Sequence, residues 1–129
     1  MMENSNAAFA EVMKNRTRAY ALRIIRLHSA LPRNSVGRVL ADQVLRSGTS
    51  VGAQFRESVR SRSRAEFISK TESALQELEE TRYWIELIVD AKLQSSNRLA
   101  SLLKETDELL AILTAMVKTA KLNRRSRES

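Results

Sequence analysis

The sequence predicts an all-α protein, an antiparallel up-down-up-down four-helix bundle, from three observations. The 129 residues include one proline and three glycines, and Leu, Ala, Glu, Arg and Lys dominate, which is typical of helices. Apolar residues recur at spacings of three and four through four segments. Short joints separate these segments and make neighbouring helices antiparallel. We expect one domain over residues 1–122 and a basic, disordered tail over 123–129.

The first helix is expected over residues 6–30 and the second over residues 35–60. Between them, Pro32 disfavours helix at Leu31, and Asn34 or Ser35 can cap the second helix. The inward stripe of the first helix consists of Phe9, Met13, Arg16, Tyr20, Ile24 and Leu27. The stripe of the second helix consists of Val36, Leu40, Val44, Val51, Phe55 and Val59.

The third helix is expected over residues 63–93 and the fourth over residues 97–122. Ser63 and Glu66 are expected to form a capping box, in which each side chain accepts a hydrogen bond from the backbone amide of the other residue. The stripe of the third helix consists of Phe67, Ile68, Thr71, Leu75, Leu78, Ile85 and Val89. The fourth helix has a seven-residue repeat, which is typical of a left-handed bundle: Leu99, Leu102, Thr106, Leu109, Leu113, Met116 and Ala120.

The last two helices carry more apolar surface than a single bundle needs. A monomeric bundle needs one stripe per helix, about 100° wide. The end of the third helix reads "YWIELIVD", and the fourth helix has a second apolar row. One interpretation is a wide core face with some exposed leucines. We expect instead an interface with another copy, formed by Tyr83, Trp84, Leu87, Leu103, Leu110 and Val117.

Small residues line one side of the second helix, namely Gly37, Ala41, Gly48 and Gly52. An interior glycine costs about 0.5–1 kcal/mol relative to alanine, and close approach of another helix can offset that cost. Gly48 and Gly52 are assigned to the oligomer interface. The alternative is that the approaching helix belongs to the same chain.

The net charge of +7 is expected to concentrate at one end of the bundle. Alternating helix direction brings segments 1–18, 56–70 and 115–129 together, with 13 basic and 5 acidic residues and a net +8, against −1 for the remainder. Arginine predominates, and its planar fork suits phosphate. The candidate nucleic-acid-binding residues are Lys14, Arg16, Arg18, Arg56, Arg60, Arg62, Arg64, Lys118, Lys121, Arg124 and Arg125.

We expect this basic pole to contact the backbone of RNA or DNA with little sequence preference. The only aromatic residues assigned to it are Phe9 and Phe67, so base stacking has little support. No membrane partner is expected, because the pole lacks an apolar face beside its charge. The alternative is that the charge serves solubility and the helix dipoles.

No enzyme, metal site or cofactor is expected from the chemistry-bearing residues. There is no cysteine, which fits a reducing cytoplasm, and no signal peptide or membrane span is visible. The lone histidine, His28, lacks the Glu-x-x-His pairs of metal-binding bundles. The pattern Ser101–Lys104 has no companion motif of acyl-transfer enzymes. Glu77 and Glu80 are interpreted as ion-pair partners of Arg82 or of an arginine on another helix.

Two segments, "RSGTSVGAQFRES" and "EFISKTESALQELEETRYWIELI", resemble the hallmarks of the bacterial four-helix-bundle protein family. That family is also named for proteins encoded in intervening sequences of large ribosomal RNA genes. The Leu31–Pro32 joint matches as well, whereas Gln54 stands where the family usually has asparagine. In the second segment the matching residues are Phe67, Ile68, Lys70, Ala74, Leu75, Glu77, Glu80, Thr81, Tyr83 and Trp84.

The resemblance covers nearly the whole chain and implies a homo-oligomer, with a homopentameric ring as the expected arrangement. It also brings in a relative, the accessory protein of diversity-generating retroelements, which works with a reverse transcriptase and its RNA template. The resulting expectation is a cytoplasmic, non-enzymatic accessory or scaffold protein that binds nucleic acid. The alternative is a protein-interaction module whose charge meets an acidic protein partner.

Overall fold

The computed structural model describes residues 2–128, with side chains for residues 6–123 and Arg125, and it contains four helices and no strand over that range. The helices are α1 (Met2–Ala30), α2 (Ser35–Val59), α3 (Arg64–Asp90) and α4 (Ser96–Glu128). The all-α class with four helices is therefore confirmed. In the structure α4 continues to Glu128, beyond the expected end of the fourth helix at residue 122, and Ser129 lies outside the described range; the expectation of a disordered tail stays a prediction.

The joints form where the sequence places caps. The Asn34 side chain accepts a hydrogen bond from the amide of Gly37 at 2.7 Å, which starts α2. The Ser63 hydroxyl accepts one from the amide of Glu66 at 3.0 Å, which starts α3 and confirms the serine half of the capping box. After α3, Lys92 adopts a positive φ of 59° and turns the chain toward α4.

The core lies along the middle of the bundle, and residues at the ends of the predicted apolar stripes are exposed. Phe9 is 43% exposed, and Val36 and Val59 at the two ends of α2 are 56% and 37% exposed. Ile88, outside the expected stripe, is buried instead. The largest fully buried side chains include Tyr20, Phe55, Met13, Ile24, Leu78, Ile85, Ile88, Leu109 and Leu113. None of the described helices has an apolar stretch long enough to span a bilayer.

The glycines of α2 pack against α1 within the same chain. A Cβ atom added to Gly48 would lie 2.7 Å from Cγ1 of Ile24, and one added to Gly52 would lie 3.2 Å from Oγ1 of Thr17. Both glycines are buried, so their assignment to an oligomer interface is wrong. The same correction applies to Val117, which is buried in a small cluster with neighbours on α3 and α4.

Buried hydroxyl pairs connect helices that are distant in sequence. The Tyr20 hydroxyl and Oγ1 of Thr106 are 2.7 Å apart and join α1 to α4. Oγ1 of Thr81 donates to Oγ of Ser47 at 2.8 Å and joins α3 to α2. Burial raises the pKa of the Tyr20 phenol well above its usual value. Because an unpaired buried hydroxyl is costly, these pairs favour one register of the helices.

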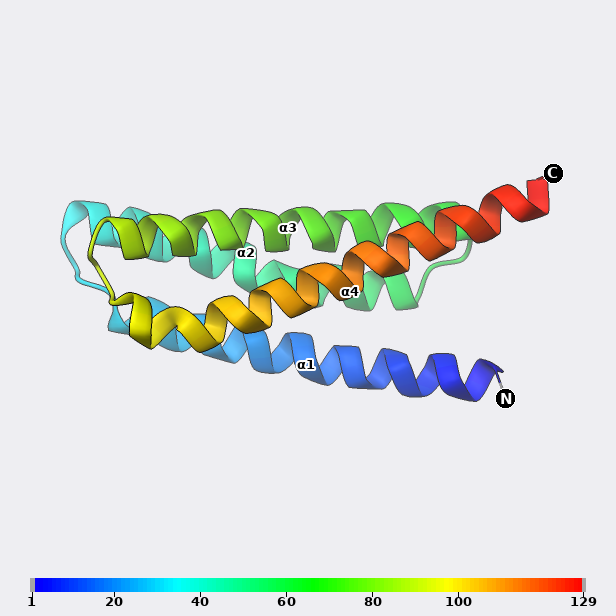
Figure 1. The fold of residues 1–129 in the computed structure, drawn as a ribbon, viewed down its shortest axis with the longest axis horizontal. Coiled ribbons are helices and arrows are strands. Elements are labelled where there is room, and N and C mark those ends of the chain that lie inside the picture. Colours follow the sequence, from blue (N-terminus) through cyan, green and yellow to red (C-terminus); the bar gives the residue numbers. More distant parts are fainter. Residues whose placement is uncertain (1, 129) are drawn as a thin grey trace.

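The two ends of the bundle differ. Figure 1 shows the chain reversing at every joint, so that the start of α1, the α2–α3 joint and the end of α4 share one end. We call this the open end, comprising residues 1–18, 56–70 and 115–129. The opposite end, which holds the other two joints, is called the closed end and comprises residues 19–42 and 90–100.

From the closed end to the inner edge of the open end, α1 and α4 are linked by side chains. Arg23 donates to Oγ of Ser101 at 3.0 Å, and further along the bundle Arg16 pairs with Glu105 at 2.7 Å. Beyond Arg16 the two helices diverge, which Figure 1 shows as a widening gap between the blue and red ribbons. There α4 packs on the start of α3 instead, through the cluster that contains Ile68.

Candidate nucleic-acid interface

Charge is distributed in three bands along the bundle. The open end has 13 basic and 5 acidic residues, a net +8. The closed end has 6 basic and 2 acidic residues, a net +4, and the remaining middle has 3 basic and 8 acidic residues, a net −5. The expectation that the whole excess lies at one pole is therefore wrong. The open end still carries twice the net charge of the closed end.

Arginines of the middle band are neutralised by carboxylates on neighbouring helices. Arg46 on α2 contacts Glu77 at 3.1 Å and Glu80 at 2.5 Å on α3. Arg82 on α3 contacts Asp107 on α4 at 2.7 Å. The hydrogen bond from Arg46 lowers the pKa of Glu80 below its usual value. The interpretation of both glutamates as ion-pair partners is confirmed, with Arg46 as the arginine.

Three of the expected phosphate-binding residues are already paired with carboxylates. Arg16 donates from Nε and Nη2 to the two carboxylate oxygens of Glu105 at 2.8 and 2.7 Å. This bidentate contact raises the pKa of Arg16 and fixes the side chain against α4. The two lysines lie 3.9 and 3.1 Å from carboxylates: Lys14 from Glu11, and Lys121 from Glu72.

Seven other expected residues form no ion pair with any side chain that the structure describes. The described part of the open end brings them together from all four helices and the α2–α3 joint: Arg18, Arg56, Arg60, Arg62, Arg64, Lys118 and Arg125. All are exposed except Arg64, which is half-buried. The remaining candidate, Arg124, has a side chain outside the described set. Unpaired and hydrated cations of this kind are free to meet phosphate.

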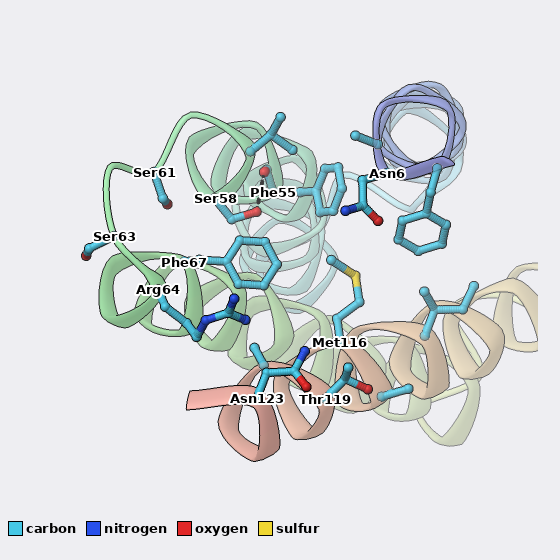
Figure 2. Close-up of a pocket in the computed structure, with 16 residues that line it drawn as sticks. Asn6, Phe55, Ser58, Ser61, Ser63, Arg64, Phe67, Met116, Thr119 and Asn123 are labelled. Carbon is cyan, nitrogen blue, oxygen red and sulfur yellow. Dashed lines mark hydrogen bonds between the residues drawn. The ribbon is translucent and has the colours of Figure 1, made fainter. Parts of the chain in front are cut away.

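An apolar groove lies among these cations, where α1 and α4 diverge. Its volume is ≈ 620 Å³, and all four helices contribute side chains to it. Figure 2 shows Phe55, Phe67 and Met116 directed into this space from α2, α3 and α4. Phe9 of α1 lines it as well. The expectation that the pole lacks an apolar face is therefore wrong.

Polar side chains lie at the rim of this open-end groove. Arg64 is the first residue of α3, and Figure 2 shows its guanidinium between Phe67 and Asn123. Asn6 lies across the groove on α1. Among the described side chains, Arg64, Asn6 and Asn123 have no hydrogen-bond partner, although each has donors to offer. The sequence analysis places Phe9 and Phe67 at this end but does not predict a groove, because the lining comes from four separate segments.

The surplus apolar surface is only partly where the sequence predicts it. Tyr83 is 53% exposed on α3, whereas Leu103 and Leu110 are half-buried against the core of their own chain. The predicted interface leaves out other apolar side chains that are exposed. They include Val12, Leu22 and Ile25 on α1, Val36 and Val39 on α2, and Leu122 on α4.

Within the described residues, no group of three or more His, Asp or Glu side chains is arranged to hold a metal ion. His28 is half-buried, and its Nε2 is 3.1 Å from Oδ1 of Asp42.

Comparison with known proteins gives a family and a fold. The model of the 23S rRNA-intervening sequence protein family matches residues 11–115. A crystal structure from Bacteroides thetaiotaomicron, described as a protein of unknown function from the S23 ribosomal protein family, is similar with a TM-score of 0.79 and 35% identity. The similarity covers 84% of this chain and 97% of that one. No curated protein matches the chain.

Proposed function

This chain belongs to the 23S rRNA-intervening sequence protein family, and on that premise we propose that it is a non-enzymatic accessory protein that binds RNA or DNA. The observation that carries the proposal is the set of seven cations at the open end that have no carboxylate partner among the described side chains. In the middle band, by contrast, Arg46 and Arg82 form ion pairs with carboxylates on neighbouring helices. The unpaired cations of the open end are available for a polyanion.

Contacts of this kind act on the phosphate backbone. The exposed arginines of the α2–α3 joint, Arg60 and Arg62, stand on a short segment between two helix ends. An arginine fork can bind one phosphate through two hydrogen bonds. Each neutralised phosphate releases counterions, so that affinity falls with salt in proportion to the number of contacts. The proposal therefore predicts tight binding at low salt and little dependence on sequence.

We place this function in a homo-oligomer, for which a ring of five antiparallel bundles is the proposed arrangement. A closed ring needs two different apolar patches that meet head to tail. Tyr83 on α3, which is 53% exposed, supports one patch, and Leu22 and Ile25 on α1, each 44% exposed, support the other. A ring would also place several open ends on one rim and multiply their field.

Light scattering tests this assembly. The chain has a mass of 14.6 kDa, and the ring predicts about five times that value. Ile25→Asp changes a side chain that is 44% exposed, so the bundle should fold while the ring dissociates. A wild-type protein whose mass by light scattering is that of a single chain would contradict the proposed ring.

Nucleic-acid binding is tested by removing cations that lie outside the groove. The triple variant Arg56→Ser, Arg60→Ser and Arg62→Ser loses three exposed charges at the open end. The matched control is Arg33→Ser, Arg38→Ser and Arg98→Ser at the closed end, also exposed. Affinity for a labelled duplex is measured by fluorescence anisotropy at several salt concentrations. The salt slope, which is the slope of log affinity against log salt concentration, should shrink by about 2–3 for the first triple only. Equal effects of the two triples would reject the open end as the binding surface.

A second candidate function is recognition of an acidic protein, and the apolar groove beside unpaired cations is the observation that favours it. An acidic amphipathic helix could place apolar side chains in the groove and carboxylates on its rim. A wild-type protein that binds no nucleic acid at 50 mM salt would favour this function. The link to a reverse transcriptase of a diversity-generating retroelement is a proposal of the same standing, tested by co-purification of the two proteins in a cytoplasmic extract.

A further inference from the structure

We infer that the open-end groove receives an unstacked base of single-stranded RNA or DNA, while the surrounding cations hold the phosphates on either side. This inference rests on the proposed nucleic-acid binding and makes it specific, because backbone contacts alone do not distinguish single strands from duplexes. Three properties of the groove support it: its aromatic walls, its unpaired polar rim and its place among the cations.

The walls of the groove suit the faces of a base. The groove is lined by the buried Phe55 and by two more accessible rings, the half-buried Phe67 and Phe9, which is 43% exposed. Figure 2 shows the rings of Phe55 and Phe67 facing the same space. Every base has a π-face that stacks on such rings, whatever the sequence. A volume of ≈ 620 Å³ is within the usual range of ligand sites and has room for a base with its sugar.

The rim of the groove suits the edge of a base. Asn6 and Asn123 each offer an amide donor and an acceptor, and neither side chain is bonded to another described group. Arg64 adds donors and a planar guanidinium on which a base can also stack. Purely aliphatic ligands would leave these groups without partners. Bases carry complementary donors and acceptors on their Watson–Crick edges.

The charge around the groove favours a strand over an isolated base. Arg60 and Arg62 lie on the α2–α3 joint, whose Ser61 and Ser63 line the groove, and Arg64 lines it at the start of α3. A strand that follows this joint would pass the groove with its phosphates next to these cations. Only a single strand, or a flipped base, can present a base to the groove, because the bases of a duplex are stacked and paired.

The first test compares strands with the wild-type protein. A 12-nucleotide single strand and its duplex are titrated by fluorescence anisotropy at the same salt, and 2-aminopurine is placed within the single strand to report stacking. We expect the single strand to bind at least about tenfold more tightly and the 2-aminopurine emission to fall on binding. Equal affinities without a change in emission would overturn the base site while leaving the proposed backbone binding intact.

The second test removes the stacking ring. Phe67→Leu keeps an apolar side chain against the cluster of Ile68 and Val117, so the bundle should remain folded, as checked by circular dichroism. We expect about tenfold weaker binding of the single strand, an unchanged salt slope and unchanged binding of the duplex. Unchanged affinity for the single strand in a folded Phe67→Leu protein would overturn the inference.

The third test uses the rim. Asn123→Ala alters an exposed side chain and carries no risk to the core. Arg64→Gln removes the half-buried cation of the rim, and its matched control is Arg33→Gln, an exposed arginine at the closed end. We expect both rim variants to restore part of the 2-aminopurine emission in the complex and the control to have no effect. Two results together would assign the groove to a protein partner instead. An acidic amphipathic peptide would displace the strand, and the emission of 2-aminopurine in the strand would not change when the strand binds the protein.

Discussion

From the closed end to the inner edge of the open end at Arg16, α1 and α4 are joined by hydrogen bonds and an ion pair, whereas beyond Arg16 the same two helices diverge. Tyr20 and Arg16 on α1 are bonded to Thr106 and Glu105 on α4. About two turns beyond Arg16, Phe9 is exposed beside a groove of ≈ 620 Å³.

This difference shows how one small bundle separates folding from binding. Where charges and hydroxyls are paired across helices, they favour one register and are unavailable to a ligand. Where the helices separate, Phe9 is exposed and several cations have no carboxylate partner among the described side chains. Binding sites often lie in such regions, because a group used for packing cannot also meet a ligand.

Truncation of one aromatic ring at each end should give the largest contrast. Tyr20→Ala removes a fully buried ring and its bond to Thr106, and it should lower the free energy of unfolding by about 3–5 kcal/mol. Phe9→Ala removes a ring that is 43% exposed and should cost less than about 1 kcal/mol. Urea unfolding followed by circular dichroism measures both. Similar losses would mean that the open end is as tightly packed as the rest.

Alanine at the two buried glycines should sharpen the comparison along α2. At Gly48 the new Cβ would lie 2.7 and 2.8 Å from the two γ carbons of Ile24, and the strain should exceed the gain in helix propensity by about 1–2 kcal/mol. At Gly52 the nearest atom, Oγ1 of Thr17, would be 3.2 Å away. We expect Gly52→Ala to lie within about 0.5 kcal/mol of wild type. Thermal unfolding distinguishes the two, and a more stable Gly48→Ala would contradict the close packing of α1.

Two arginines near the open end should separate folding from binding. Arg16→Gln breaks a bidentate, part-buried ion pair and should cost about 0.5–1 kcal/mol of stability with less than a twofold change in nucleic-acid affinity. Arg60→Gln alters an exposed side chain without an ion pair among the described residues, and it should weaken binding about two- to fivefold without loss of stability. Anisotropy titrations measure the affinities, and urea midpoints measure the stabilities. If Arg16 contacted phosphate, Arg16→Gln would instead weaken binding without loss of stability.

The smallest expected effect is the pH dependence of the middle band. Arg46 lowers the pKa of Glu80, so the folded state favours the carboxylate. The resulting stability is present above the usual glutamate pKa of about 4.5 and is lost as pH falls through the lowered value in the folded state. The side chains of Arg46 and Glu80 are 50% and 36% exposed, and screening by solvent keeps the effect small. Urea midpoints between pH 3 and 7 should show a difference between wild type and Arg46→Gln that shrinks below pH 4.5; a constant difference would contradict the linkage.

Much of the fold could be predicted from the sequence, because the signals are local. The single proline and the caps at Asn34 and Ser63 define the joints, and period-3.6 patterns define which side chains are buried. The errors fall at helix ends. Val36 and Val59 lie on the stripe of α2 but have no helix opposite them, and periodicity does not reveal where a neighbouring helix stops.

The candidate site was harder to predict, because its partners are distant in sequence. Small residues on α2 indicate close approach, but not that the approaching residues are Ile24 and Thr17 of the same chain. The pair of Arg16 with Glu105 spans 89 positions, so no local pattern separates this arginine from the unpaired ones. The groove arises from the divergence of α1 and α4, which depends on packing angles rather than on the pattern of any one helix.

Photo-cross-linking of a single strand that contains 5-iodouracil tests the central claim most directly. The cross-linked peptides of the wild-type protein are identified by mass spectrometry. Cross-links confined to the open end, with Phe67 or Phe9 as the modified residue, are the predicted result. Cross-links at the closed end around Arg33 and Arg98, or spread evenly along the bundle, would contradict the assignment of binding to the open end.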